Sequence, residues 1–133
     1  MTEQKPVKVV VSGSFSDPER LWRFITDLRN HKLDVIYPTM EHLGASRETI
    51  AAQHGGKGET DRTTKLRAKL MKKYFAKIHE CDILFVFNCK KDEEHVGLGA
   101  AMEIGYAYAL GKQIRFAYTP RDGNVLSMTR LVK

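Results

Sequence analysis

An unbroken apolar run, ILFVF at residues 83–87, is the feature that most constrains the fold of this chain. All five side chains are apolar, so both faces of the strand that the run predicts must be covered. Strands buried on both faces are typical of parallel sheets, because the crossover connections of such sheets place helices on either side. The run therefore predicts a central strand of an α/β protein.

Three further short runs of strand type lie at residues 7–11, 33–37 and 114–118. Strand, helix and strand alternate along the chain, and this order is typical of a doubly wound parallel sheet. We expect a flavodoxin- or Rossmann-like sheet of four to five strands in three α/β/α layers. The first strand should be central, with the second on one side and the third on the other.

Helical patterns fill the intervals between these strands. A capping sequence, SDPE, opens a helix that runs to about His31, and a long amphipathic pattern covers residues 62–80. A third helix is expected over residues 99–110, where Gly111 ends it. Residues 46–53 and the C-terminal tail each have the pattern of a short helix.

The composition predicts a single cytoplasmic domain, residues 1–133, that needs neither metal nor cofactor. A chain of 133 residues is long enough to bury one core, and it contains no apolar run of membrane-spanning length. Its N-terminus has no apolar signal region. Cys81 and Cys89 are eight residues apart without the spacing of a zinc site, so both should be free thiols.

The net charge of +6 favours anionic partners. Eight of the Lys and Arg residues fall within the 21 residues from Lys57 to Lys77, and seven of these lie in the long amphipathic pattern. Such a cluster is either a solvated helix face or a site for nucleotide phosphate or nucleic acid. We expect a small nucleoside or nucleotide as the ligand, and neither nucleic acid nor a membrane.

Two loops should flank the ligand site, because ligands of doubly wound sheets bind at the carboxyl ends of the strands where the strand order reverses. The first loop begins Ser12-Gly13-Ser14, and its backbone N–H groups and hydroxyls suit an anion such as phosphate. The alternative is that Gly13 only makes the turn and Ser16 caps the helix. In the second loop we expect Asn88, which directly follows the buried run, to contact the ligand.

Glu103 is the one acid of the stretch GLGAAMEIGYAYALGK, residues 97–112, and it follows two glycines, Gly97 and Gly99. The glycines allow a ligand to approach the backbone closely. The helix dipole should keep the carboxylate ionised. Glu103 either caps free N–H groups or faces a ligand cleft, where an ionised carboxylate suits attack on a cationic carbon such as a glycosidic carbon.

The sequence EIGYAYALGK, the glycine pattern before it and the first loop VSGSF resemble the nucleoside 2-deoxyribosyltransferase family. That family includes the 2'-deoxynucleoside 5'-monophosphate N-hydrolases, and the likeness spans roughly residues 7–118. The resemblance implies cleavage or transfer at an N-glycosidic bond, with Glu103 as the nucleophile that attacks C1' of the sugar. It further implies that the nucleoside or its phosphate is contacted by Ser12, Gly13, Ser14 and Phe15, and that Gly97 and Gly99 line the sugar or phosphate site.

The chain departs from the family pattern at the acid that would assist departure of the base. Family members carry an aspartate eight residues before the acid that opens the third strand, and Tyr74 stands at that position here. Candidate replacements are Tyr74, His95, Glu93 and Glu94, of which Tyr74 and His95 are the expected catalytic residues. The alternative is a non-catalytic nucleotide-binding or sensor protein on the same fold. The resemblance and the apolar helix at residues 106–110 also predict a homodimer or a higher homo-oligomer.

Overall fold

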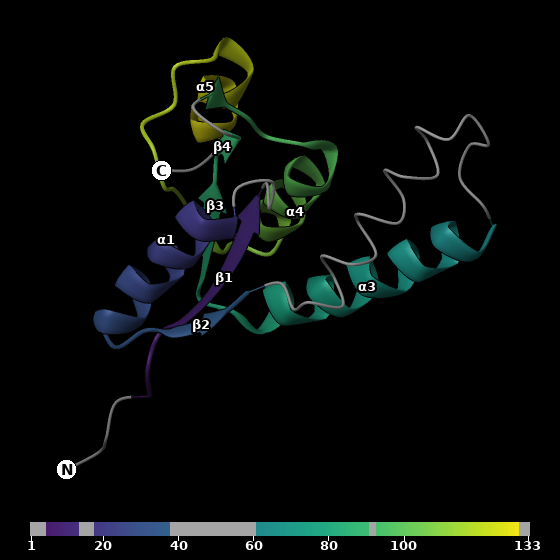
Figure 1. The fold of residues 1–133 in the computed structure, drawn as a ribbon, viewed down its shortest axis with the longest axis horizontal. Helices are drawn as coiled ribbons and strands as arrows, with labels where there is room; N and C mark the ends of the chain where they lie inside the picture. The colour runs from purple at the N-terminus through teal and green to yellow at the C-terminus, as the bar shows by residue number, and fades with distance from the viewer. Residues whose placement is uncertain (1–4, 14–17, 38–60, 91–92, 131–133) are drawn as a thin grey trace. The chain divides into compact units, whose positions relative to one another are not determined.

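The computed structural model describes residues 5–13, 18–37, 61–90 and 93–130 (Figure 1). The chain divides into two compact units, one made of Met1–Tyr37 with Lys77–Lys133 and the other of Pro38–Ala76. The short helix expected over residues 46–53 lies outside the described residues, as do Ser14 and Phe15. The single-domain assignment stays a prediction.

The first unit contains a four-stranded parallel sheet with the strand order β2-β1-β3-β6. The strands are β1 (Lys8–Gly13), β2 (Asp34–Ile36), β3 (Ile83–Phe87) and β6 (Gln113–Phe116). The sequence-based prediction of a parallel sheet with β1 beside both β2 and β3 is confirmed. The described residues also contain a short antiparallel pair of strands, β4 (Cys89–Lys90) and β5 (Glu93–Glu94). This pair was not predicted.

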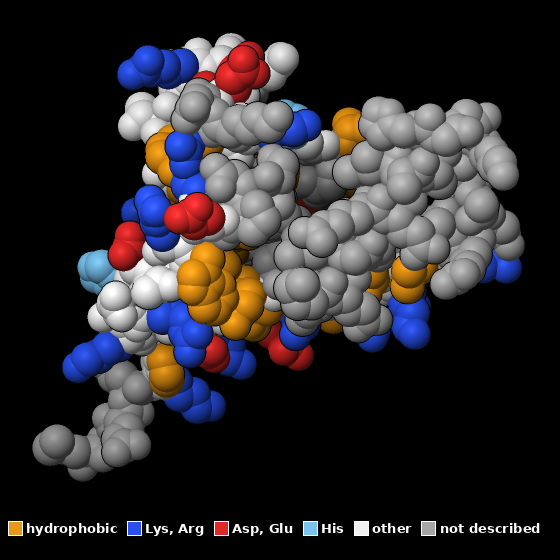
Figure 2. All heavy atoms as spheres, in the orientation of Figure 1, with side chains coloured by type: hydrophobic (Ala, Val, Ile, Leu, Met, Phe, Trp, Pro, Cys, Tyr) orange, Lys and Arg blue, Asp and Glu red, His pale blue; other side chains and the backbone are white. Residues whose placement is uncertain are grey.

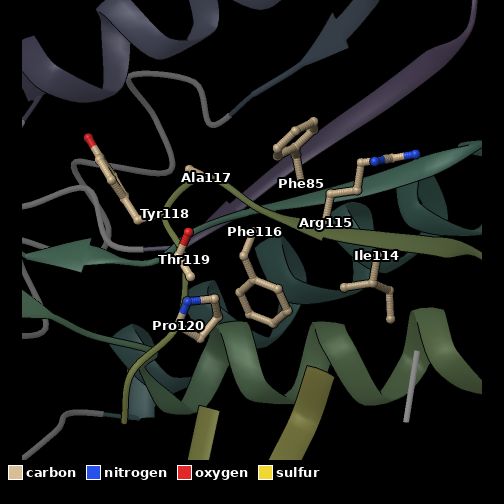
Figure 3. Close-up of a pocket in the computed structure, with 8 residues that line it drawn as sticks. All are labelled: Phe85, Ile114, Arg115, Phe116, Ala117, Tyr118, Thr119 and Pro120. Atoms are coloured by element: carbon tan, nitrogen blue, oxygen red, sulfur yellow. The ribbon is translucent and has the colours of Figure 1, made fainter. Parts of the chain in front are cut away.

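Helices cover both faces of the sheet. Helix α1 (Pro18–Asn30) packs on one face, where its Leu21 and Ile25 join Val9 and Val11 of β1 in a buried cluster. Helix α4 (Leu98–Ala109) contacts β1, β3 and β6 on the opposite face. Figure 3 shows the two helices on opposite sides of the strands. This arrangement explains why β1 and β3 are apolar on both faces.

Helix α4 ends just before Gly111, as the sequence predicted. Gly111 has a φ of 72°, and its N–H donates to the Tyr108 carbonyl at 3.0 Å, while Lys112 N–H donates to the Ala107 carbonyl at 2.9 Å. This hydrogen-bond pair is the Schellman motif, whose left-handed residue is usually glycine. The chain can therefore turn directly from α4 into β6.

Helix α3 (Asp61–Glu80) crosses the boundary between the two units. The apolar stripe predicted for it is confirmed, because Leu70, Tyr74 and Ile78 are all buried. A last helix, α5 (Gly123–Arg130), occupies the tail as expected. Its N-terminus is capped by Asp122, whose carboxylate accepts from Asn124 N–H at 2.9 Å.

Candidate functional site

The carboxyl end of β1 positions Ser12 and Gly13 beside β3. Ser12 is fully buried and lies opposite Val86, and Gly13 lies opposite Phe87. Gly13 has a φ of 136°, and a Cβ at this position would overlap the carbonyl oxygen of Phe87. Glycine is therefore required here by the close approach of two strands, whatever the ligand is.

Glu103 is the sixth residue of α4, on a helix that packs against β1. Burial raises the pKa of its carboxyl group from 4.5 to about 7, and the nearby Ser12 hydroxyl opposes this rise. Ser12 Oγ and Glu103 Oε2 are nevertheless buried oxygens without a hydrogen-bond partner of good geometry among the described residues. Strand β1 and helix α4 thus bring together the side chains of Ser12 and Glu103, which are far apart in the sequence. Each of the two side chains has an oxygen that can still form a hydrogen bond.

The raised pKa corrects the expectation that the helix dipole keeps Glu103 ionised. Glu103 lies in the second turn of α4, and the first turn contains no acid. The favourable field of a helix N-terminus falls off within the first turn, so desolvation is the larger effect. With a pKa of about 7, the carboxyl group is only about half ionised at pH 7.

The two predicted glycines of the second loop lie at the start of α4. Gly97 is the N-cap residue, with extended backbone and no side-chain cap, and its carbonyl accepts from Ala101 N–H at 2.9 Å. A Cβ on Gly97 would lie 3.4 Å from Nε2 of the half-buried His95, whereas a Cβ on Gly99 would meet nothing. His95 is therefore placed beside the N-terminus of the helix that carries Glu103.

Asn88 is buried, with 1% of its surface exposed, and its side chain connects the ends of two neighbouring strands. Its Nδ2 donates to the Tyr118 carbonyl and its Oδ1 accepts from Tyr118 N–H, both at 3.0 Å. Its own carbonyl accepts from His95 N–H at 3.2 Å. Asn88 thus connects β3, the segment after β6 and the loop that leads to α4, and its predicted contact with a ligand stays a prediction.

Glu94 makes a second connection that was not anticipated from the sequence. Its Oε2 accepts from the backbone N–H groups of Arg121 and Asp122, each at 2.9 Å, while its Oε1 is buried without a partner among the described residues. The donors are backbone groups, so no pairing of side-chain types in the sequence could have indicated this contact.

Tyr74 lies on α3 within the second compact unit, where its side chain is buried. Its role as a replacement for the family's aspartate stays a prediction. Cys81 and Cys89 are both buried and are not joined in a disulfide, and Arg20 Nη1 donates to Cys89 Sγ at 3.1 Å. In the described part of the chain, no group of three His, Cys, Asp or Glu side chains could hold a metal ion.

A surface hollow of about 410 Å³ runs along β6 and the residues that follow it, and Tyr118, which is hydrogen-bonded to Asn88, is among its lining residues (Figure 3). Phe85 and Arg115 point to one side of the sheet there, and Ile114 and Phe116 point to the other. None of the residues that line it carries a carboxylate or an imidazole. The chemistry that the sequence predicts therefore rests on Glu103 and its neighbours.

Among the described residues, Figure 2 shows Lys and Arg side chains on several parts of the face in view, with Asp and Glu side chains among them. No helix within the described ranges is both long and apolar enough to cross a membrane.

The family model for nucleoside 2-deoxyribosyltransferases matches residues 13–129, which is most of the chain. The chain belongs to the nucleoside 2-deoxyribosyltransferase family. The resemblance carried by EIGYAYALGK is confirmed at the level of the family. No functionally curated protein sequence is significantly similar to this member of the family.

Solved structures share the fold of this family member at low sequence identity. A CMP N-glycosidase of Clostridium botulinum is 20% identical, with a TM-score of 0.52, over 94% of this chain and 82% of the other. A 2-deoxyribosyltransferase of Leishmania mexicana is 18% identical, with a TM-score of 0.54, over 92% and 71%. A 2-deoxyribosyltransferase of Bacillus psychrosaccharolyticus is 18% identical, with a TM-score of 0.57, over 95% and 82%.

Proposed function

We propose that this protein cleaves or transfers the N-glycosidic bond of a nucleoside or a nucleoside monophosphate, with Glu103 as its nucleophile. Membership of the family supports the reaction class. Both activities named for the similar structures, N-glycosidase and deoxyribosyltransferase, act at this bond. The observation that carries the proposal is the buried carboxyl group of Glu103, which lies near Ser12 and has one oxygen without a partner among the described residues.

The proposed step begins with attack of a Glu103 carboxylate oxygen on C1' of the sugar. The C1'–N bond breaks as the C1'–O bond forms, and its electron pair leaves with the nitrogen of the base. The product is a glycosyl ester on Glu103, which resembles the covalent intermediate of retaining glycosidases. Attack at C1' by water releases the sugar and completes hydrolysis, whereas attack by a second base completes transfer.

The environment of Glu103 suits a nucleophile that works after water has been excluded. Burial removes hydration that would otherwise stabilise the free carboxylate, and the same effect raises its pKa to about 7. The ionised form is therefore available at neutral pH and is more reactive than a solvated carboxylate. We infer that the Ser12 hydroxyl, fully buried beside it, donates a hydrogen bond to the carboxylate or to the sugar.

The departing base must gain a proton at its nitrogen. No acid occupies residues 71–76, where the family pattern has an aspartate. His95 is our first candidate donor, because it lies beside the N-cap of the helix that carries Glu103. Tyr74 is the second candidate. Replacing His95 by Gln should lower the rate most for substrates whose base is a poor leaving group, since these depend most on protonation.

The test is to incubate the protein with a panel of nucleosides and nucleoside 5'-monophosphates and to measure the released base by chromatography. Rapid quenching of a reactive substrate should give a protein whose mass has increased by one glycosyl group, with the added mass on the peptide that contains Glu103. Base release without any adduct on that peptide would reject Glu103 as the nucleophile. Tight binding of a nucleotide with no base release would favour a nucleotide sensor.

A further inference from the structure

Two hollows adjoin beside strand β6, which is at one edge of the sheet. One has a volume of about 380 Å³ and lies between α1 and the segment that follows β6, and the other, of about 410 Å³, runs along β6 itself. Both are lined by Ala117 and Tyr118, so they meet at the end of β6. Ligand pockets have volumes of about 300 to 1,000 Å³, so each hollow is large enough for a small organic molecule.

The sheet separates the α1 side of these hollows from Glu103. Val11 of β1 packs with α1, and successive residues of a strand point to opposite faces, so Ser12 points toward α4 and Glu103. Figure 3 shows Phe85, Arg115 and Tyr118 on the side of the strands where α1 lies. A ligand that contacts these side chains therefore lies across the sheet from the proposed nucleophile.

Tyr118 presents an aromatic ring that is held in place although it is 42% exposed. Asn88 fixes its backbone, since the Asn88 side chain bonds both the N–H and the carbonyl of Tyr118 at 3.0 Å. Phe87 packs against the edge of its ring, with the two ring centroids 5.8 Å apart. A ring that is already ordered loses little conformational entropy when a ligand packs on it, and this favours binding.

Arg20 lines the same hollow and is also held in place. Its Nη1 donates to Cys89 Sγ at 3.1 Å, and Cys89 is the residue after Asn88. The end of β3 therefore positions both a guanidinium group and an aromatic ring on one hollow, through two consecutive residues.

The charges around the hollows favour an anion. Their described lining residues include three arginines and one acid, namely Arg20, Arg23, Arg115 and Asp27. Glu19, one turn before Arg23 on α1, makes an exposed ion pair with it at 2.9 Å. Guanidinium groups match carboxylate and phosphate oxygens in geometry and also stack on flat rings, so arginines beside aromatic side chains suit a ligand that has both features.

We propose that these hollows bind a small aromatic acid, that is, a molecule with a flat ring and one carboxylate or phosphate group. The ring packs on Tyr118 and Phe24, and the anionic group pairs with Arg20 and Arg23. The net charge of +6 attracts such a ligand over longer distances. Binding at this place is independent of the glycosidic reaction proposed above. Aromatic carboxylic acids and nucleotides share the required chemistry, and their affinities distinguish them.

Titration of the full ¹⁵N-labelled chain, followed by NMR, locates the ligand. The probes are 4-hydroxybenzoate and adenosine 5'-monophosphate, with phenol and inorganic phosphate as controls that offer only the ring or only the anion. At least one of the two acids should shift the amide signals of Phe24, Ala117 and Tyr118, and the acid that binds more tightly shows which anion the site selects. Each control should bind at least about tenfold more weakly.

Shifts at Ser12 and Gly97 report the proposed glycosidic site separately. If adenosine 5'-monophosphate shifts Ala117 and Tyr118 but leaves Ser12 and Gly97 unchanged, the aromatic-acid site stands and nucleotide binding beside Glu103 is contradicted. If neither acid shifts Ala117 and Tyr118 at millimolar concentration, the aromatic-acid site is rejected, whatever happens at Ser12.

Two matched variants of α1 test the role of charge. Arg23→Gln should weaken binding of the selected acid about tenfold or more, because one charge-assisted contact is lost. Its melting temperature should change little, since the ion pair with Glu19 is exposed. Arg29→Gln removes the same charge from the last turn of α1, where Arg29 is exposed and lines neither hollow, and it should bind as the wild type does. Equal weakening in both variants would show attraction by net charge alone and would overturn the proposal.

Discussion

Replacement of Glu103 by Gln should raise stability while abolishing activity. Burial raises the pKa of Glu103 from 4.5 to about 7, so the folded chain holds this proton more tightly than the unfolded chain. The stabilising effect of the proton is complete below pH 4.5 and is lost as the pH rises to about 7. Above that pH, the ionised carboxylate lowers the free energy of unfolding by about 3 kcal/mol relative to acid conditions.

Glutamine preserves the shape of the side chain and removes its charge. At pH 8 we expect Glu103→Gln to increase the free energy of unfolding by up to about 3 kcal/mol, or roughly 10 °C in Tm for a chain of this length. At pH 5 the wild-type carboxyl group is protonated, so the gain should be less than about 1 kcal/mol. Base release should fall by orders of magnitude, because an amide cannot form the glycosyl ester.

The assay pairs thermal unfolding at pH 5 and pH 8 with base release on the same preparations. Glu80→Gln provides the control, because Glu80 is exposed at the end of α3 and the same chemical change there should leave both quantities nearly unchanged. A Glu103→Gln variant that melts lower than the wild type at pH 8 would show that the carboxylate stabilises the fold as a cap. A variant that releases base at the wild-type rate would refute the catalytic role.

Three further predictions follow from the site. For wild-type base release, kcat/KM should rise about tenfold per pH unit up to about pH 7 and then level off, because the nucleophile must be ionised; a profile that is flat from pH 5 to 8 would contradict this. Gly13→Ala should lower the free energy of unfolding by more than about 2 kcal/mol in chemical denaturation, because the methyl group would overlap the Phe87 carbonyl. Gly111→Ala is the control, and because open space surrounds this position it should lower the free energy of unfolding by only about 1 kcal/mol. Asn88→Asp should lower the free energy of unfolding by about 2 kcal/mol at pH 7, because a carboxylate would face the Tyr118 carbonyl. Part of this loss should be regained on acidification, when the carboxylate is protonated. A Tm difference from the wild type that does not change with pH would exclude this explanation.

A fourth prediction concerns the ligand. A nucleoside monophosphate should bind about ten- to a hundred-fold more tightly than its nucleoside at low salt, since each charge-assisted phosphate contact contributes about 1.5 to 3 kcal/mol. The basic residues between Lys57 and Lys77 and the Ser12–Ser14 turn motivate this expectation. Equal affinities in calorimetry would reject it.

Local sequence patterns predicted the main helices and strands because each of these patterns is compatible with one kind of local structure. The apolar run at Ile83–Phe87 had to be covered on both faces, and Gly111 had to follow a helix that turns into a strand. The short β4–β5 pair could not be predicted in this way. Its strands are two residues each, so neither has a periodic pattern, and the pair depends on contacts such as that of Glu94 with the backbone of a distant segment.

The sequence by itself indicated that β1 lies between β2 and β3, which family the chain resembles, and that Glu103 is the acid of interest, because these inferences depend on the order, spacing and type of residues along the chain. Only the tertiary structure decided what surrounds that acid. It showed that desolvation outweighs the helix dipole at Glu103 and that Gly13 serves the packing of two strands. It also placed the side chain of Asn88 on the backbone of Tyr118. Burial, strand separation and contacts with distant backbone arise when segments far apart in the sequence meet, so no local pattern contains them.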